Sequence, residues 1–166
     1  KHVSIDSKKE MAICRDAMRP GEEISGDQYV CRSKGRLAST FGKENDAMRY
    51  HGGTIFLDHY SGFTFIGNQV SLGIGETLKT KRAFERFAAE HGVNLQHFRL
   101  DNQPFDSQAF REDLEDNGQT VSFSGVGAHP QNGVAARAQG AIFSWTRAQM
   151  MRELLHRPAQ AAATLW

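Results

Sequence analysis

The order of strand-like and helix-like patterns constrains the fold of this chain more than any other feature. Segments rich in β-forming residues come first, at 24–31, 54–58 and 63–70, and a short turn joins the last two into a hairpin. A helical pattern follows at 76–91, and short strand patterns at 95–100 and 120–123 then alternate with two further helices. This order predicts an α/β fold: a mixed five-stranded sheet, antiparallel first and parallel afterwards, flanked by helices.

Individual residues indicate where the helices begin and end. Gly92 and Gly118 are each expected to follow the last residue of a helix. Asp106 is predicted to be the N-cap of the middle helix, with Phe105 and Phe110 at the positions of a hydrophobic staple.

The same patterns divide the chain into three parts. Residues 1–22 are polar and irregular and are interpreted as a leader or linker, 23–157 as the folded core, and 158–166 as a tail that starts a truncated downstream segment. Within the core, the stretch 32–53 is rich in Ser, Gly, Lys and Arg and is expected to be a long loop. The last helix is expected to bury Trp145.

The composition is that of one soluble globular domain, with 39% hydrophobic and 23% charged residues. No apolar run approaches the ~20 residues of a membrane-spanning helix and no signal peptide opens the chain, so we expect neither a membrane protein nor a secreted one. The formal net charge of +1 does not by itself indicate a partner. Cys14 and Cys31 have no second cysteine at metal-ligand spacing, which favours free thiols over a zinc site.

Two aspartates lie where function is expected in such a sheet. Asp27 falls inside the first strand, on the face it shares with Tyr29, where an unpaired carboxylate is costly to bury. Asp101 directly follows strand 95–100, at the edge where open α/β sheets bind ligands. Taken alone, Asp101 is also typical of a turn or a helix entry.

Two carboxylates from adjacent central strands can hold a hard cation such as Mg²⁺ through oxygen ligands. A pair of such metals activates a water or hydroxyl for phosphodiester chemistry, and holding both normally takes a third acidic group. Asp58 is better explained as a turn acid, whose side chain can bond the backbone of the turn at 60–62.

Five segments carry a resemblance to a known family. They are SGDQYV, YHGGTIFLDHYSGF, SLGIGETLKTKRAFERF, LDNQPF and FSGVGAHPQNGVAARAQGAI. In this order they resemble the integrase core of Ty1/copia-type retrotransposons, over about residues 24–157. The pairing of Asp-Asn with a later NGVA and a helix is the most specific part of the match.

That family has an RNase H-like fold and cuts and joins DNA ends with two Asp and one Glu that hold Mg²⁺ or Mn²⁺. The resemblance implies that Asp27 and Asp101 are the two catalytic, metal-binding aspartates. The family's Glu directly follows NGVA, and this chain has Ala136 at that position. The resemblance also implies DNA partners (element ends and target), a homo-oligomer, and a location in the nucleus or in a cytoplasmic retrotransposon particle.

No neighbouring acid replaces the missing Glu. The sequence has no Asp or Glu between Asn117 and Arg152, and Glu153 lies on the order of 25 Å further along the predicted helix. Asp113 and its acidic neighbours belong to another helix and are expected on its solvated side. Because Ala is favourable in a helix, we expect Ala136 to leave the fold intact.

Polar and basic residues supply the candidates for nucleic-acid binding, which are Asn132, Arg137, Lys79, Lys81 and Arg82. The last three form a cluster on the 76–91 helix, and a merely solvated face is the alternative interpretation for them and for Arg137. Gly140 and Phe143 occupy exposed positions, one and two turns after position 136, where integrases often carry a basic residue that grips DNA.

The sequence therefore predicts the integrase catalytic domain of a retrotransposon polyprotein. Its ancestral reaction is DNA integration by Mg²⁺-dependent 3′-end processing and strand transfer, and this copy is expected to be inactive as a polynucleotidyl transferase. The alternative is a catalytically dead domain that binds nucleic acid or a protein partner.

Overall fold

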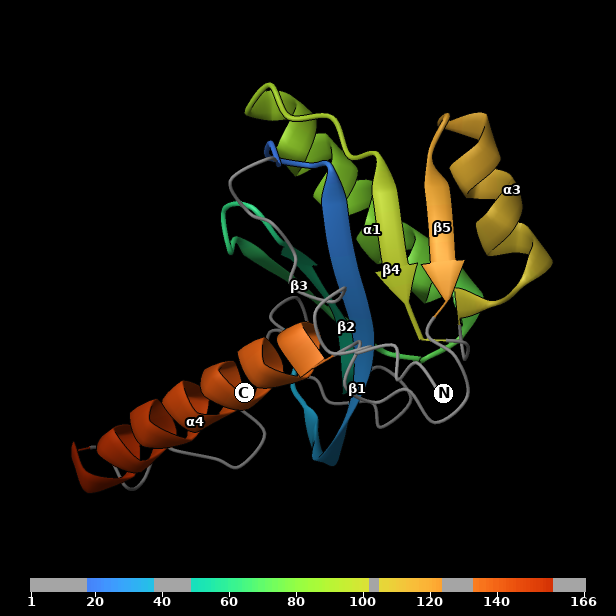
Figure 1. Cartoon of the computed structure of the whole chain (residues 1–166). Coiled ribbons are helices and arrows are strands. Elements are labelled where there is room, and N and C mark those ends of the chain that lie inside the picture. The colour runs from blue at the N-terminus through green and yellow to red at the C-terminus, as the bar shows by residue number, and fades with distance from the viewer. Residues whose placement is uncertain (1–17, 38–48, 102–104, 124–132, 157–166) are drawn as a thin grey trace, which may run out of the picture.

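The computed structural model describes residues 18–37, 49–101, 105–123 and 133–156 (Figure 1). Its elements are β1 (Glu23–Gly35), β2 (Tyr50–Asp58), β3 (Thr64–Gln69), α1 (Ile74–Glu90), β4 (His97–Leu100), α3 (Gln108–Asp116), β5 (Thr120–Phe123) and α4 (Gly133–His156). The predicted order of strands and helices is confirmed. The predicted loop at 32–53 is wrong at both ends, because β1 and β2 continue to pair beyond a register shift between Val30 and Gly35.

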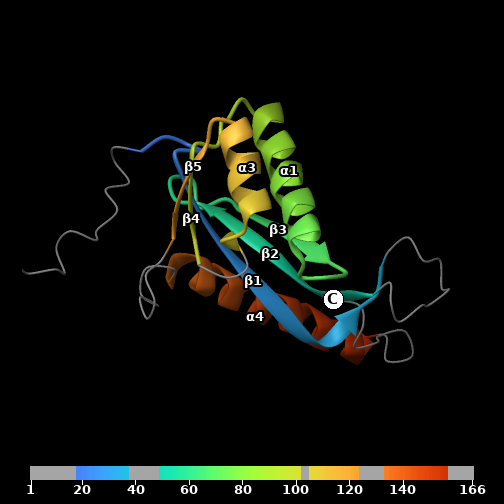
Figure 2. The same ribbon diagram turned by 90° about the vertical axis from the view of Figure 1, so that its right-hand side faces the viewer.

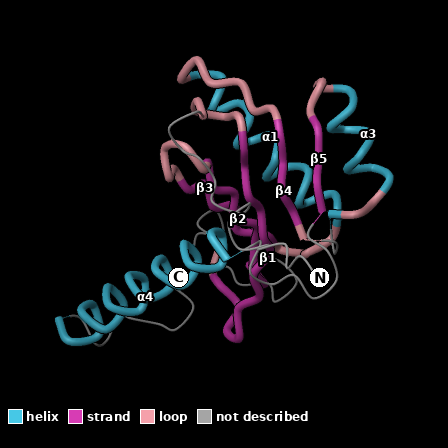
Figure 3. The backbone as a smooth tube through the Cα atoms, in the orientation of Figure 1, coloured by secondary structure: helices cyan, strands magenta, loops and turns pink. Residues whose placement is uncertain are grey.

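One mixed sheet holds the five described strands, in the order β3-β2-β1-β4-β5 (Figure 3). β1 pairs antiparallel with β2 and β2 antiparallel with β3, as the hairpin pattern predicts. β4 lies parallel to β1, and β5 parallel to β4. Because the chain crosses through α1 to return beside β1, the end of β4 lies next to Gly26, near the start of β1.

Helices cover both faces of this sheet. Figure 2 shows α1 and α3 side by side on one face and α4 on the other. In agreement, α1 contacts β2 and β3, α3 contacts β5, and α4 contacts β1 and β2. Alternate residues of β1 therefore face different layers, so that Ile24 packs in the core beneath α1 while Tyr29 contacts Phe143 of α4.

The core between the sheet and the α1–α3 layer is largely aromatic. Phe56 stacks on Phe84 with 5.7 Å between ring centroids and meets Phe98 edge-on at 5.8 Å. Gly26 of β1 makes room for this packing, since a Cβ there would lie 2.5 Å from Cδ2 of Leu100. Aromatic rings bury large apolar areas, so these contacts stabilise the packing of α1 on the sheet.

The cap of α3 differs from the prediction by one residue. The N-cap is Ser107, whose hydroxyl accepts a hydrogen bond from the Phe110 backbone N–H at 3.3 Å. Asp106 instead accepts from the Arg111 side chain. The predicted contact between Phe105 and Phe110 is present, with ring centroids 5.5 Å apart.

The two helix-ending glycines are confirmed, with φ of 72° at Gly92 and 65° at Gly118. The prediction for Trp145 is wrong, because its side chain is 69% exposed. Helix α4 projects beyond the sheet (Figure 1), so the layer that would bury this ring does not extend to it. None of the described helices is both long enough and apolar enough to cross a membrane.

Candidate active site

Asp27 and Asp101 lie next to one another on adjacent strands. Gly26 of β1 pairs with Leu100, the last residue of β4. Asp27 directly follows Gly26 in the sequence, and Asp101 directly follows Leu100. The charge of Asp101 raises the pKa of Asp27, so the two carboxyls are close enough to interact electrostatically. The parallel register of β1 and β4 therefore brings together the two acids singled out from the sequence.

Burial and like charge together determine the electrostatics of Asp27. Desolvation is the main reason that the pKa of its half-buried carboxyl rises above the ordinary value of 3.8. The negative charge of Asp101 adds to this, whereas the Gln28 backbone N–H lowers the pKa by donating to Oδ1 at 2.8 Å. Because Asp101 is exposed, the pair is reachable from solvent. Two carboxylates that repel each other in this way are stabilised by a shared cation.

Helix α4 carries position 136 on the Asp27 face of the sheet. The helix contacts β1 and β2, and Phe143 meets Tyr29, which shares a face of β1 with Asp27. In the first turn of α4, Ala135 is fully buried while Ala136 is exposed. A methyl group at position 136 supplies no ligand, yet its exposure leaves space for a longer side chain.

The donor set fits a hard, oxygen-ligated cation, but only in part. Asp27 and Asp101 supply two carboxylates, the ligand type that Mg²⁺ and Mn²⁺ prefer. Among the described residues, no group of three or more His, Cys, Asp or Glu side chains could hold a metal ion. Glu153 does not complete the set, because α4 is one continuous helix and about 25 Å of it separates Glu153 from position 136.

Asp58 has the structural role predicted from the sequence. Its Oδ2 accepts from the backbone N–H and the hydroxyl of Ser61 in the turn between β2 and β3, and its Oδ1 accepts from the Gly21 N–H at 3.0 Å. The carboxylate therefore ties the segment before β1 to this turn.

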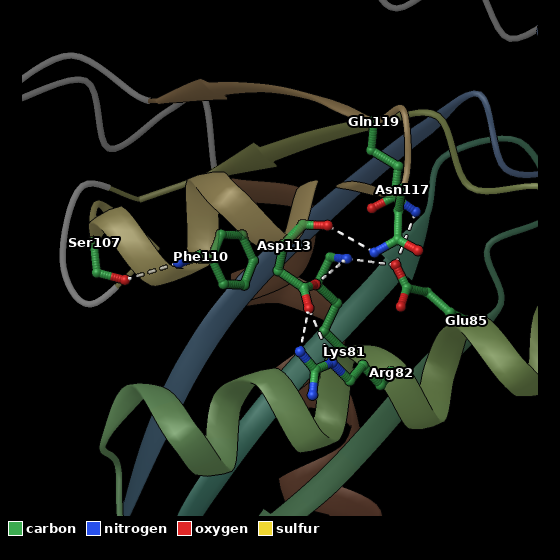
Figure 4. A network of polar contacts seen from close by, with 8 residues as sticks. All are labelled: Lys81, Arg82, Glu85, Ser107, Phe110, Asp113, Asn117 and Gln119. Carbon is green, nitrogen blue, oxygen red and sulfur yellow. Dashed lines mark hydrogen bonds and ion pairs between the residues drawn. The ribbon is translucent and has the colours of Figure 1, made fainter. Parts of the chain in front are cut away.

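Lys81 is buried in an ionic network between α1 and α3 (Figure 4). Its side chain is 0% exposed, and Nζ lies 2.8 Å from Oδ2 of Asp113 and 2.5 Å from Oε1 of Glu85. Arg82 binds the other oxygen of Asp113 at 2.6 Å, and Gln119 donates to Glu85 at 2.8 Å. Two predictions are therefore wrong: Lys81 is not on a surface that nucleic acid can reach, and Asp113 is not solvated.

The other candidates for nucleic-acid binding are divided between the two faces of the sheet. Lys79 and Arg82 are 75% and 58% exposed and lie on α1, on the face opposite to Asp27. Arg137 is exposed in the first turn of α4, on the Asp27 side. Asn132 lies outside the described residues.

Sequence reasoning missed a group of contacts beside the acids. Phe143, expected to be exposed, is half-buried and meets the Tyr29 ring edge-on at 5.3 Å between centroids. The Tyr29 hydroxyl donates to Asn68 of β3 at 2.5 Å. The available signal was Gly53 inside β2, since a glycine within a strand often marks a close approach by another group.

The sequence matches no model of a known protein family and no curated protein. Solved structures do match. The chain is similar to the HTLV-2 integrase catalytic core domain in complex with magnesium, in its dimeric form, with a TM-score of 0.54 and 20% identity over 85% of this chain and 77% of that one. The trimeric form matches with a TM-score of 0.53 and 20% identity, over 84% and 76% of the two chains.

A third similar structure is the simian T-cell lymphotropic virus intasome in complex with the PP2A regulatory subunit B56 gamma. Its TM-score is 0.58 at 16% identity, over 86% of this chain and 44% of that one. Similarity at this level of identity concerns the fold. The chain has the fold of a retroviral integrase catalytic core, which confirms the predicted RNase H-like class with its mixed five-stranded sheet.

Proposed function

We propose that this chain is an integrase-type catalytic core in which Asp27 and Asp101 are the remaining ligands of a Mg²⁺ or Mn²⁺ site, and that Ala136 impairs polynucleotidyl transfer. The observation that carries the proposal is the parallel register of β1 and β4, which places Asp27 and Asp101 side by side at the end of β4. Similarity to integrase cores in complex with magnesium supports it. The motifs shared with Ty1/copia-type elements support an origin in a retrotransposon polyprotein.

The residues present explain both what the site retains and what it lacks. When bound, a divalent cation stabilises phosphodiester oxygens as a Lewis acid and lowers the pKa of a bound water or hydroxyl. Asp27 and Asp101 offer it two carboxylates, and binding relieves their mutual repulsion. With Ala136 as the third residue, the set has one carboxylate fewer than two metals need, so we expect strand transfer to be reduced by orders of magnitude.

The proposed partners are DNA, as element ends and target, and further copies of the chain. Arg137 is exposed one residue after position 136, where it can reach a phosphate near the acids. Asn132 is proposed as a second DNA contact. The dimeric and trimeric forms of the similar HTLV-2 core support self-association. The proposed location is the nucleus or a cytoplasmic retrotransposon particle.

Strand-transfer assays on labelled oligonucleotides with Mn²⁺ test the proposal. The variants are the natural chain, Ala136→Glu, and Ala136→Glu combined with Asp101→Asn as the matched control. We expect activity in Ala136→Glu alone. Full activity in the natural chain would refute the proposal that Ala136 impairs strand transfer. If no variant is active but all bind DNA with a steep dependence on salt, the domain is a nucleic-acid-binding module rather than an integrase that has lost one catalytic residue.

A further inference from the structure

We propose that Tyr29 and Phe143 are positioning residues, whose ring contact holds α4 on the sheet and thereby determines where position 136 stands relative to Asp27. This inference rests on the proposed function, since it concerns the same site. It assigns a role to the contact that the sequence did not reveal.

Tyr29 is held rigidly by three neighbouring strands. In the register of the sheet, Tyr29 of β1 is opposite Gly53 of β2, which is opposite Asn68 of β3. The Tyr29 side chain crosses Gly53 to donate its hydroxyl hydrogen to Asn68 Oδ1 at 2.5 Å. A Cβ at Gly53 would lie 2.5 Å from that hydroxyl, so this path needs a glycine. With 4% of its surface exposed, Tyr29 is a fixed platform.

Phe143 places α4 on that platform. The two rings meet at 5.3 Å and 80°, the edge-to-face geometry that aromatic pairs prefer. Towards its start, α4 is held by the fully buried Ala135. Position 136 is next to Ala135 and about two turns, on the order of 10 Å, before Phe143. The side chain at position 136 therefore lies between two points at which the helix touches the sheet.

Other residues of α4, such as Ile142 and Thr146, are at most half-buried, and the end of the helix provides no anchoring. Trp145 and Met151 are 69% and 65% exposed, and every residue from 151 to 156 is exposed. Asp27 is one pleat away from Tyr29 on the same face of β1, about 7 Å along the strand. A change in how Phe143 packs on Tyr29 is thus expected to move position 136 relative to Asp27.

Spin-label distances test this inference without metal or activity. Labels are attached at Gly75→Cys on α1 and Gly140→Cys on α4, in a chain whose native cysteines are replaced by serine. At both glycines a Cβ meets nothing within 4 Å, so the labels fit. We expect a narrow distance distribution in the parent and one that broadens or shifts by several ångströms in Phe143→Ala.

Matched variants distinguish positioning from general destabilisation. Phe87→Ala removes another half-buried ring, which stacks on Phe63 at 5.0 Å on the opposite face of the sheet, and is expected to leave the distribution narrow. Phe143→Tyr keeps an aromatic ring and is expected to give a distance distribution as narrow as that of the parent. Phe143→Leu keeps an apolar side chain and serves if the alanine variant does not fold. An unchanged distribution in every folded Phe143 variant that lacks an aromatic ring would overturn the inference.

Metal affinity supplies the second measurement. In the Ala136→Glu background, we expect Phe143→Ala to weaken Mn²⁺ binding by about tenfold, the effect typical of residues that orient a ligand, while Phe87→Ala leaves it unchanged. If Ala136→Glu itself binds Mn²⁺ no more tightly than the natural chain, the proposed function fails, and the label distances still decide the positioning role.

Discussion

Replacing Lys81 with Met tests the ionic network between α1 and α3. The side chains of Lys81 and Asp113 are 0% and 6% exposed, and Nζ of Lys81 also lies 5.5 Å from the centroid of the Phe98 ring. Methionine fills a similar volume without a charge. It leaves Asp113 buried with Arg82 as its remaining cation, and Glu85 with Gln119.

The expected cost follows from this arrangement. Removing one partner of a buried ion pair typically costs about 3–5 kcal/mol, because the other charge remains desolvated. The lower end, about 3 kcal/mol, applies here, since Arg82 still compensates Asp113 and Glu85 is 18% exposed. For a domain of this size, 3 kcal/mol lowers Tm by roughly 6–12 °C.

Urea denaturation followed by circular dichroism measures this cost, with Lys79→Met as the control. Lys79 is 75% exposed and pairs only with Glu76 among the contacts described, so its replacement should change the free energy of unfolding by less than about 0.5 kcal/mol. Combining Lys81→Met with Asp113→Leu should cost less than the sum of the single changes. If Lys81→Met were as harmless as Lys79→Met, the buried network would not stabilise the fold.

The network also predicts a pH dependence. Burial alone raises the pKa of Asp113, but hydrogen bonds and charges from Lys81 and Arg82 outweigh it, so the pKa is lowered from 3.8. The stability that this carboxylate contributes is fully present above pH 3.8 and is lost as the pH falls through the lowered value. The difference in Tm between the natural chain and Asp113→Asn should therefore become smaller as the pH falls below 3.8.

Two further predictions concern the sheet. Asp27→Asn should raise Tm at pH 7, because the raised pKa of Asp27 means that its charged form costs stability. This gain in Tm should vanish as the pH falls through the folded-state pKa towards 3.8. A gain that did not depend on pH would contradict the raised pKa of Asp27. Gly53→Ala should cost about 3 kcal/mol in urea denaturation, since its Cβ would lie 2.2 Å from the carbonyl oxygen of Gly67, whereas Gly75→Ala, with nothing within 4 Å, should be neutral or slightly stabilising.

The sequence was sufficient to predict the features that depend on local pattern. Strand and helix order, the β2–β3 hairpin with its turn acid Asp58, and the helix-ending Gly92 and Gly118 all follow from periodicity and turn chemistry. The alternation of strands and helices predicts parallel neighbouring strands, and the pairing of β1 with β4 places Asp27 beside Asp101.

Features that depend on distant partners could not be predicted in this way. Lys81 follows the apolar spacing of α1, but its burial is tolerable only because Asp113 arrives from α3. The helical pattern around Trp145 predicts that its ring is buried, but the exposure of this ring depends on how far the sheet extends beneath α4. The seat of Phe143 on Tyr29 requires the alignment of three strands. Each of these outcomes depends on tertiary packing, which local pattern does not encode.

Calorimetric titration of Mn²⁺ into three forms of the chain tests the central claim most directly. The claim is that Asp27 and Asp101 form a cation site that lacks its third ligand at position 136. We predict weak binding by the natural chain, no binding by Asp101→Asn, and binding at least tenfold tighter by Ala136→Glu. Equal affinities in all three forms would contradict the claim, because the metal would then depend on neither Asp101 nor position 136.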